Sequence, residues 1–144
     1  MKKIIFMIFL GLGVLLGING CSAKGKPFVK FKKTKKDMGI VYFYRPSNIK
    51  GYLINYPIFD KKMNKILGNL KNGSYFSIEM KEGIHKIGTY TNSIEIEIKK
   101  NSFMCIRIYA DIDLILRPYV PYIGLHKVSN NICKAEIIET RKNE

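Results

Sequence analysis

The sequence has no tryptophan, two histidines, three cysteines, and 11 acidic residues against 25 lysines and arginines. With so few histidines and cysteines, and no His-x-x-x-His or Cys-x-x-Cys spacing, it offers no recognisable set of metal ligands. The chain also has no Gly-x-Ser-x-Gly elbow, and beyond its first segment it has no glycine-rich phosphate loop. We therefore expect a protein that is not an enzyme and that uses no metal or other cofactor.

Long hydrophobic runs are equally scarce, and the only one lies at the start of the chain. Two lysines precede 15 apolar or small residues at positions 4–18, three of them glycines. As a helix this run would span roughly 22 Å, short of the ~30 Å hydrocarbon core of a bilayer. A positive start, a short apolar stretch and small residues at its end are typical of an export signal. The alternatives are a retained membrane anchor and an ordinary cleaved signal.

A cysteine follows this signal directly, in the motif Ile18-Asn19-Gly20-Cys21. The motif resembles the lipobox of bacterial lipoproteins. This resemblance implies cleavage before Cys21, a diacylglyceryl group on its thiol, acylation with fatty acids such as palmitate, and attachment to a membrane. Ser22 stands where an aspartate would imply retention in the inner membrane, so we expect a cell-envelope protein in the outer membrane that faces the periplasm.

The positive charge is concentrated behind this cysteine. The net charge is +14, and seven lysines without any acidic residue lie between Lys24 and Lys36. An exported protein has no access to nucleic acid, so the expected anionic partners are phospholipids, lipopolysaccharide and cell wall. We divide the chain into a signal peptide (residues 1–20), a lipidated lysine-rich tether (21–37) and one domain (38–144). The tether is either a flexible spacer or a segment that lies on the membrane. Its apolar residues Phe28, Val29 and Phe31 favour docking on the domain or insertion into the interface.

The rest of the chain has the pattern of β-strands. Isoleucines alternate with glutamates over residues 94–98, as in a strand buried on one face. Other segments rich in β-branched and aromatic residues predict strands, separated by turn signals. They are residues 40–44, 52–59, 66–68, 75–80, 84–90 and 103–110, with weaker ones at 114–116 and 122–128. A break near Pro57 indicates an edge or a bulge. We predict an all-β fold, an antiparallel β-sandwich, in which residues 130–140 form a short C-terminal helix capped by Ser129 or a last strand.

Three short motifs together are similar to an uncharacterised family of bacterial lipoproteins with a small β-sandwich domain. They are Val41-Tyr42-Phe43-Tyr44-Arg45-Pro46, Leu70-Lys71-Asn72-Gly73-Ser74-Tyr75-Phe76 and Glu82-Gly83-Ile84-His85. In that family they form a strand ending in Tyr-Arg-Pro, a Gly-x-Tyr turn and a Gly-x-His hairpin. Glu82 replaces the usual proline of the hairpin. The resemblance implies the fold and a lipid anchor but no activity.

The candidate binding residues are aromatic, with one arginine and one histidine. They are Tyr42, Tyr44, Arg45, Tyr75 and His85. Tyrosine rings and an arginine can form a face for a sugar or a peptide, but such residues are equally typical of a sandwich core, and a histidine after a turn glycine usually bonds the turn backbone. We expect a non-enzymatic binding or scaffold module for an envelope protein, acting by strand addition at a sheet edge. The alternative is a glycan- or lipopolysaccharide-binding module that uses the tyrosine–arginine face and the basic tether.

Two cysteines remain once Cys21 carries lipid. In an oxidising periplasm Cys105 and Cys133 can form a disulfide. Two buried thiols are the alternative.

Overall fold

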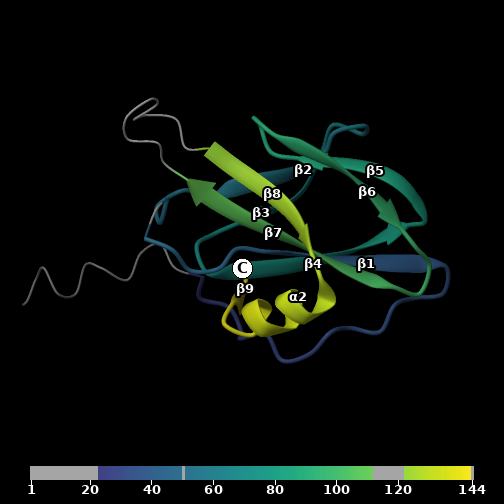
Figure 1. Ribbon diagram of the computed structural model, residues 1–144, viewed down its shortest axis with the longest axis horizontal. Helices are drawn as coiled ribbons and strands as arrows, with labels where there is room; N and C mark the ends of the chain where they lie inside the picture. Colours follow the sequence, from purple (N-terminus) through teal and green to yellow (C-terminus); the bar gives the residue numbers. More distant parts are fainter. Residues whose placement is uncertain (1–22, 50, 112–121, 144) are drawn as a thin grey trace, which may run out of the picture.

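The strands form two sheets packed face to face. The computed structural model describes residues 23–49, 51–111 and 122–143, and Figure 1 shows the two layers with one short helix beside them. The five-stranded sheet has the order β8 (Tyr122–Val128), β7 (Phe103–Asp111), β1 (Met38–Tyr44), β4 (Ser74–Lys81) and β9 (Arg141–Lys142). The four-stranded sheet has the order β3 (Lys65–Leu70), β2 (Tyr56–Asp60), β5 (Gly83–Gly88) and β6 (Ser93–Ile98). The predicted all-β sandwich is confirmed.

Two strand pairs run parallel within this otherwise antiparallel arrangement. β1 pairs with β4 in the antiparallel sense and with β7 in the parallel sense, and β9 adds to β4 in parallel. Parallel neighbours need a long crossover between them. Between β1 and β7 the chain forms β4 and all four strands of the other sheet. The crossover therefore contains the second layer of the sandwich.

Strand β1 lies at the centre of the molecule and is buried on both faces. Val41 and Phe43 point into the core between the sheets, where Ile58, Ile96 and Ile106 also pack. The alternate β1 residues belong to a second cluster on the outer face of the five-stranded sheet. A strand covered on both sides has no polar face, which explains the uninterrupted apolar sequence of β1.

The predicted strands mostly match the observed ones, and the clearest difference is at the start of β2. The alternation at residues 94–98 is confirmed, because Ile96 and Ile98 are buried while Glu95 and Glu97 are exposed. The strand predicted at 52–59 begins only at Tyr56, and its pairing with β3 has the predicted irregularity, between Ile58 and Phe59. Residues 52–55 belong instead to a loop that follows a tight turn. Of the two weaker predictions, the strand at 122–128 is confirmed as β8, and the one at 114–116 lies outside the described residues.

The C-terminal segment forms the helix α2 (Asn130–Ile137) and then the short strand β9. Ser129 is its N-cap, and the serine side chain accepts a hydrogen bond from the Ile132 amide. Of the two alternatives for residues 130–140, the helix is therefore correct. Figure 1 shows α2 and the N-terminal segment on the same side of the five-stranded sheet, away from β2 and β5.

Candidate functional site

The lysine-rich segment after the signal forms part of the folded domain. Residues 23–33, which we call the strap, are fixed by backbone hydrogen bonds along their length. The Ala23 amide donates to the Asn72 carbonyl at 3.3 Å and the Phe28 amide donates to the Thr140 carbonyl at 3.1 Å. The Lys32 amide donates to the Tyr42 hydroxyl at 2.6 Å. The interpretation of residues 21–37 as a flexible spacer is therefore wrong for the strap, which packs as part of the folded domain from Ala23 onward.

Aromatic side chains hold the strap on the sheet. Phe28 is buried, with its ring edge-on to Tyr42 at 6.0 Å and to Tyr75 at 5.2 Å between centroids. Phe31 stacks on Phe103 at 4.5 Å. Val29 is 81% exposed. The predicted docking on the domain is thus confirmed for Phe28 and Phe31 and wrong for Val29.

Tyr44 joins the sheet to α2 through a polar contact. Its hydroxyl donates to Glu136 at 2.5 Å, and Arg107 forms an ion pair with the same carboxylate at 2.8 Å. Burial of the phenol, followed by its hydrogen bond to Glu136, raises the pKa of Tyr44. A cleft of about 230 Å³ lies beside this contact, and its lining includes Arg107, Tyr109 and Glu136. Glu136 and Arg107 were not singled out by the sequence, because they come together only when α2 packs on β7.

Arg45 is a buried cation that organises a loop. Its guanidinium donates to the carbonyls of Gly51 at 2.6 Å and Ile54 at 2.7 Å, and lies 4.6 Å from the centre of the Tyr56 ring. Burial lowers the pKa of Arg45. Gly51 has φ +68°, and a Cβ there would lie 2.8 Å from the Ala110 side chain. Arg45 thus bonds backbone carbonyls of the loop that follows β1.

The predicted tyrosine–arginine face does not exist as an exposed surface. Tyr42, Tyr44 and Arg45 are each at most 1% exposed, because the strap, α2 and the loop after β1 cover them. Tyr75 is half-buried beneath Phe28. These residues form a core on the outer face of the sheet, so the glycan-binding alternative loses its tyrosine–arginine face and keeps only the basic tether.

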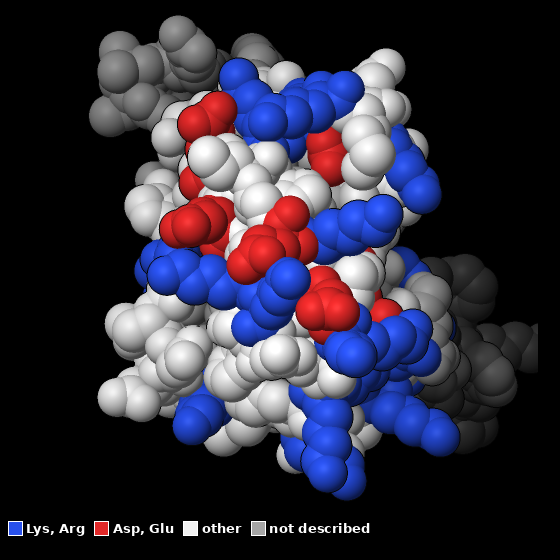
Figure 2. All heavy atoms as spheres, turned by 90° about the vertical axis from the view of Figure 1, so that its right-hand side faces the viewer, with Lys and Arg blue, Asp and Glu red and all other residues white. Residues whose placement is uncertain are grey.

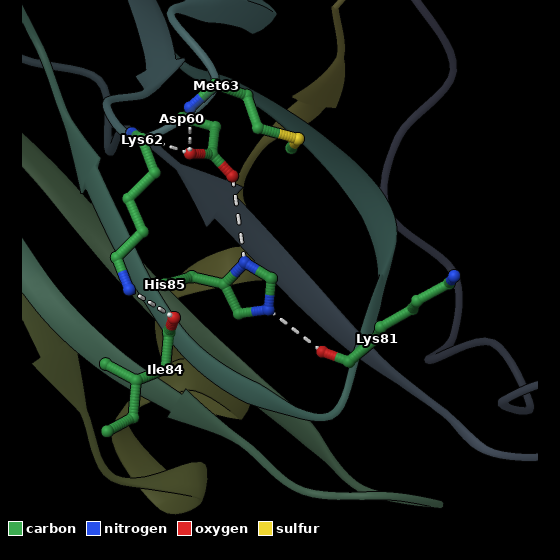
Figure 3. Close-up of polar contacts among 6 residues, drawn as sticks. All are labelled: Asp60, Lys62, Met63, Lys81, Ile84 and His85. Atoms are coloured by element: carbon green, nitrogen blue, oxygen red, sulfur yellow. Dashed lines mark hydrogen bonds and ion pairs between the residues drawn. The ribbon is translucent and has the colours of Figure 1, made fainter.

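His85 lies on the other sheet and connects two turns (Figure 3). Its Nε2 lies 2.9 Å from the Lys81 carbonyl oxygen and therefore carries a proton, since a carbonyl only accepts. Its Nδ1 faces the buried carboxylate of Asp60 at 3.7 Å. The other Asp60 oxygen accepts from the amides of Lys62 and Met63. The predicted structural role of His85 at the turn backbone is confirmed, whereas Asp60 was missed because a single aspartate before a turn gives no distinctive signal.

A groove opens next to His85, between β3 of one sheet and β4 of the other. It measures about 370 Å³, and three methionines contribute to its lining together with Leu67 and His85. They are Met38, Met63 and Met80. Methionine side chains adapt to the shape of a partner and are over-used at binding surfaces. β3 is an edge strand of its sheet and exposes Ile66 by 54%. Edge and groove together form the surface best suited to an extended peptide.

Cys105 and Cys133 form a disulfide that connects β7 to α2. Their Cα atoms are 6.0 Å apart and both residues are fully buried. Of the two alternatives, paired cysteines or thiols, the structure has the pair. The bond lies in the same outer-face cluster as Tyr44 and Phe28.

Comparisons with protein-family models, curated proteins and solved structures gave no match to this chain. The similarity to a lipoprotein family therefore stays a prediction, as does acylation of Cys21, which lies outside the described residues. Within residues 23–49, 51–111 and 122–143, no group of three histidine, cysteine or acidic side chains is placed to hold a metal ion. The same residues contain no helix long and apolar enough to cross a membrane.

Proposed function

We propose that the protein is a lipoprotein of the cell envelope, acylated at Cys21, and that its β-sandwich is a non-enzymatic module that binds another protein. The observation that carries the proposal is the motif Ile18-Asn19-Gly20-Cys21 directly ahead of a domain with a disulfide. Structural disulfides persist in exported proteins and are rare in the cytosol. The disulfide thus supports export of the domain, and Ser22 is the basis for placing it on the outer membrane, facing the periplasm.

Fatty-acid labelling with membrane fractionation tests the anchor. Wild-type protein should incorporate labelled palmitate and fractionate with the outer membrane, and Cys21→Ser should lose both properties. A variant that remains uncleaved in the inner membrane, beside a wild type without label, would show that residues 4–18 are a permanent anchor.

The edge strand β3 and the methionine-lined groove support a protein partner. A strand added to β3 would gain main-chain hydrogen bonds, and its side chains would reach the groove beside Leu67 and Met80. The two histidines of the chain also have partners within the fold: His85 bonds a turn carbonyl, and His126 Nε2 lies 3.0 Å from the Tyr109 hydroxyl. Their engagement in the fold favours binding over catalysis.

Site-specific photocrosslinking tests this surface. A photoreactive residue at Ile66 should capture one defined envelope protein, and the same residue at Ile138 should not. Ile138 is the matched control because it is 58% exposed, close to the 54% of Ile66, but follows α2 on the outer face of the other sheet. Ile66→Glu should reduce co-purification of the captured protein. Equal capture from both positions would contradict binding at β3.

A further inference from the structure

The proposed lipid attachment point is close in sequence to the folded domain. Only Ser22 separates Cys21 from Ala23, whose side chain is buried and whose amide bonds the Asn72 carbonyl. Two residues of extended chain span at most about 7 Å. A lipid on Cys21 would therefore hold this part of the domain at the membrane surface, with no spacer to let it turn away.

The loop after β1 shares this end of the molecule. Asn72 connects the two: its side-chain oxygen accepts from the Asn48 amide at 3.0 Å, and its side-chain nitrogen donates to the Ser47 hydroxyl at 3.3 Å. In Figure 1 the loop between β1 and β2 lies at the left, at the same end of the sandwich as the start of the described chain. We call this the anchor end and define it by Ala23, residues 46–49 and 51–53, and Asn72.

Two of the most exposed apolar side chains belong to the anchor end. Ile49 is 91% exposed and Leu53 is 74% exposed. The loop that carries them is ordered by internal hydrogen bonds, from the Tyr52 amide to the Ile49 carbonyl and from the Ile54 amide to the Gly51 carbonyl. The buried Arg45 fixes the same loop. Two large aliphatic side chains on one ordered loop beside basic residues have the composition of a contact with the membrane interface.

The charge at this end is mainly positive and comes from four separate segments. Residues 23–30, 46–53, 71–75 and 141–143 include lysines and an arginine but no acidic residue. Two acids lie next to them: Glu136, which lines a cleft with Pro46 and is paired with Arg107, and Asp111, which follows Ala110 beside Gly51. Lysines and arginines near an anionic membrane are attracted to it within about a Debye length. The anchor end is therefore complementary to anionic lipid headgroups.

The opposite end differs in charge. There Lys100 lies 3.5 Å from Asp37 and 3.6 Å from Glu82. Figure 2 looks onto this end and shows acidic side chains across its middle with basic ones around them. Such mixed charge gives much less net attraction to an anionic surface.

We propose that the anchor end rests on the anionic headgroup layer of the membrane that holds the lipid, with Ile49 and Leu53 in the interface. The inference rests on acylation of Cys21 and adds a fixed orientation to it. β1 and β4 run between the two ends, so these strands stand away from the membrane. The methionine-lined groove, which includes Met38 at the start of β1 and Lys81 at the end of β4, then faces the aqueous side.

The test compares two exposed positions in the full acylated protein. Leu53→Cys and Ile84→Cys each receive an environment-sensitive fluorophore; Ile84 is 62% exposed and follows the turn after β4, at the opposite end. The purified proteins are reconstituted into vesicles of phosphatidylglycerol and phosphatidylethanolamine that contain lipid with a nitroxide at the headgroup or in the acyl chain. We expect a blue shift and nitroxide quenching at position 53 and neither at position 84. Quenching at 53 should fall when phosphatidylcholine replaces phosphatidylglycerol.

Each other outcome overturns the inference in a different way. Equal and weak quenching at both positions, on protein whose mass confirms the acyl chains, would show that the domain tumbles on its anchor. A blue shift at 53 without quenching from either nitroxide would show that a protein covers the loop. Absence of acyl chains would refute the lipid anchor itself, and the orientation with it.

Discussion

The disulfide between Cys105 and Cys133 allows a quantitative test of what holds the outer-face cluster together. Changing both residues to alanine removes the bond without leaving an unpaired thiol. The sequence separation of 28 residues corresponds, by chain entropy, to a stabilisation of about 3.6 kcal/mol at 25 °C. This is a large share of the ~5–15 kcal/mol by which domains are usually stable.

Native contacts other than the bond should remain in the double variant. Ser129 still caps α2, and Glu136 still bonds Tyr44 and Arg107. An isolated helix of eight residues is not stable in water, so these contacts and the packing of Ile137 must retain α2 on the sheet. The double variant should therefore fold, with a lower free energy of unfolding.

Urea denaturation followed by circular dichroism and tyrosine fluorescence measures the loss, since the chain has no tryptophan to mask the tyrosine signal. With a slope of about 1–3 kcal/mol/M for a small domain, the midpoint should fall by roughly 1–3.5 M. Wild-type protein unfolded in the presence of reductant is the control and should show a similar loss. A decrease below about 1 kcal/mol would refute the loop-closure reasoning, which puts the disulfide at about 3.6 kcal/mol.

Three further changes test the strap, the phenol of Tyr44 and the buried arginine. Phe28→Ala should lower the free energy of unfolding by about 3 kcal/mol, as for other buried phenylalanines, while Val29→Ala should stay within about 0.5 kcal/mol; equal effects in urea denaturation would contradict docking of the strap. The pKa of Tyr44 is raised in the folded state, so its contribution to stability is complete below the unfolded pKa of about 10. Above that pH the free energy of unfolding falls by about 1.4 kcal/mol per pH unit. Tyr44→Phe should remove that part of the alkaline decline in urea midpoints, and an unchanged decline would contradict it. Arg45→Met should cost about 3 kcal/mol through two lost charged hydrogen bonds and should speed hydrogen exchange of the amides in residues 46–55; unchanged exchange there would contradict the role of Arg45 in ordering the loop.

Local patterns were sufficient to predict the strands but not their pairing. The alternation of isoleucine and glutamate in β6 identifies a strand with one buried face, and the structure bears this out. The parallel pairing of β1 with β7 joins residues about 60 positions apart, and no local signal encodes it. For residues 130–137 the sequence could not decide between a helix and a strand, because these eight residues carry a weak apolar pattern. Ser129 nevertheless marks the start of the helix correctly.

The candidate site shows a different limit of sequence reasoning. Tyr42 and Tyr44 have the composition of a binding face, and whether they are exposed depends on which distant segments cover them. Here Phe28 precedes the predicted start of the domain at residue 38, and Cys133 lies near the C-terminus. The aromatic side chains could be identified from the sequence. Their burial by the strap and the C-terminal segment could not be predicted from it.

The strap explains why a lysine-rich segment can be part of a fold. Seven lysines between Lys24 and Lys36 are typical of a solvated spacer, yet a few apolar side chains are enough to pack such a segment on a sheet. Phe28 and Phe31 supply these contacts, while the lysines at positions 30, 32 and 33 are exposed. The same lysines therefore keep their charge for an anionic surface while the two rings fix their position. A segment of this composition can be both an ordered part of the domain and the basic surface next to a lipid anchor, and the two phenylalanines distinguish it from a spacer.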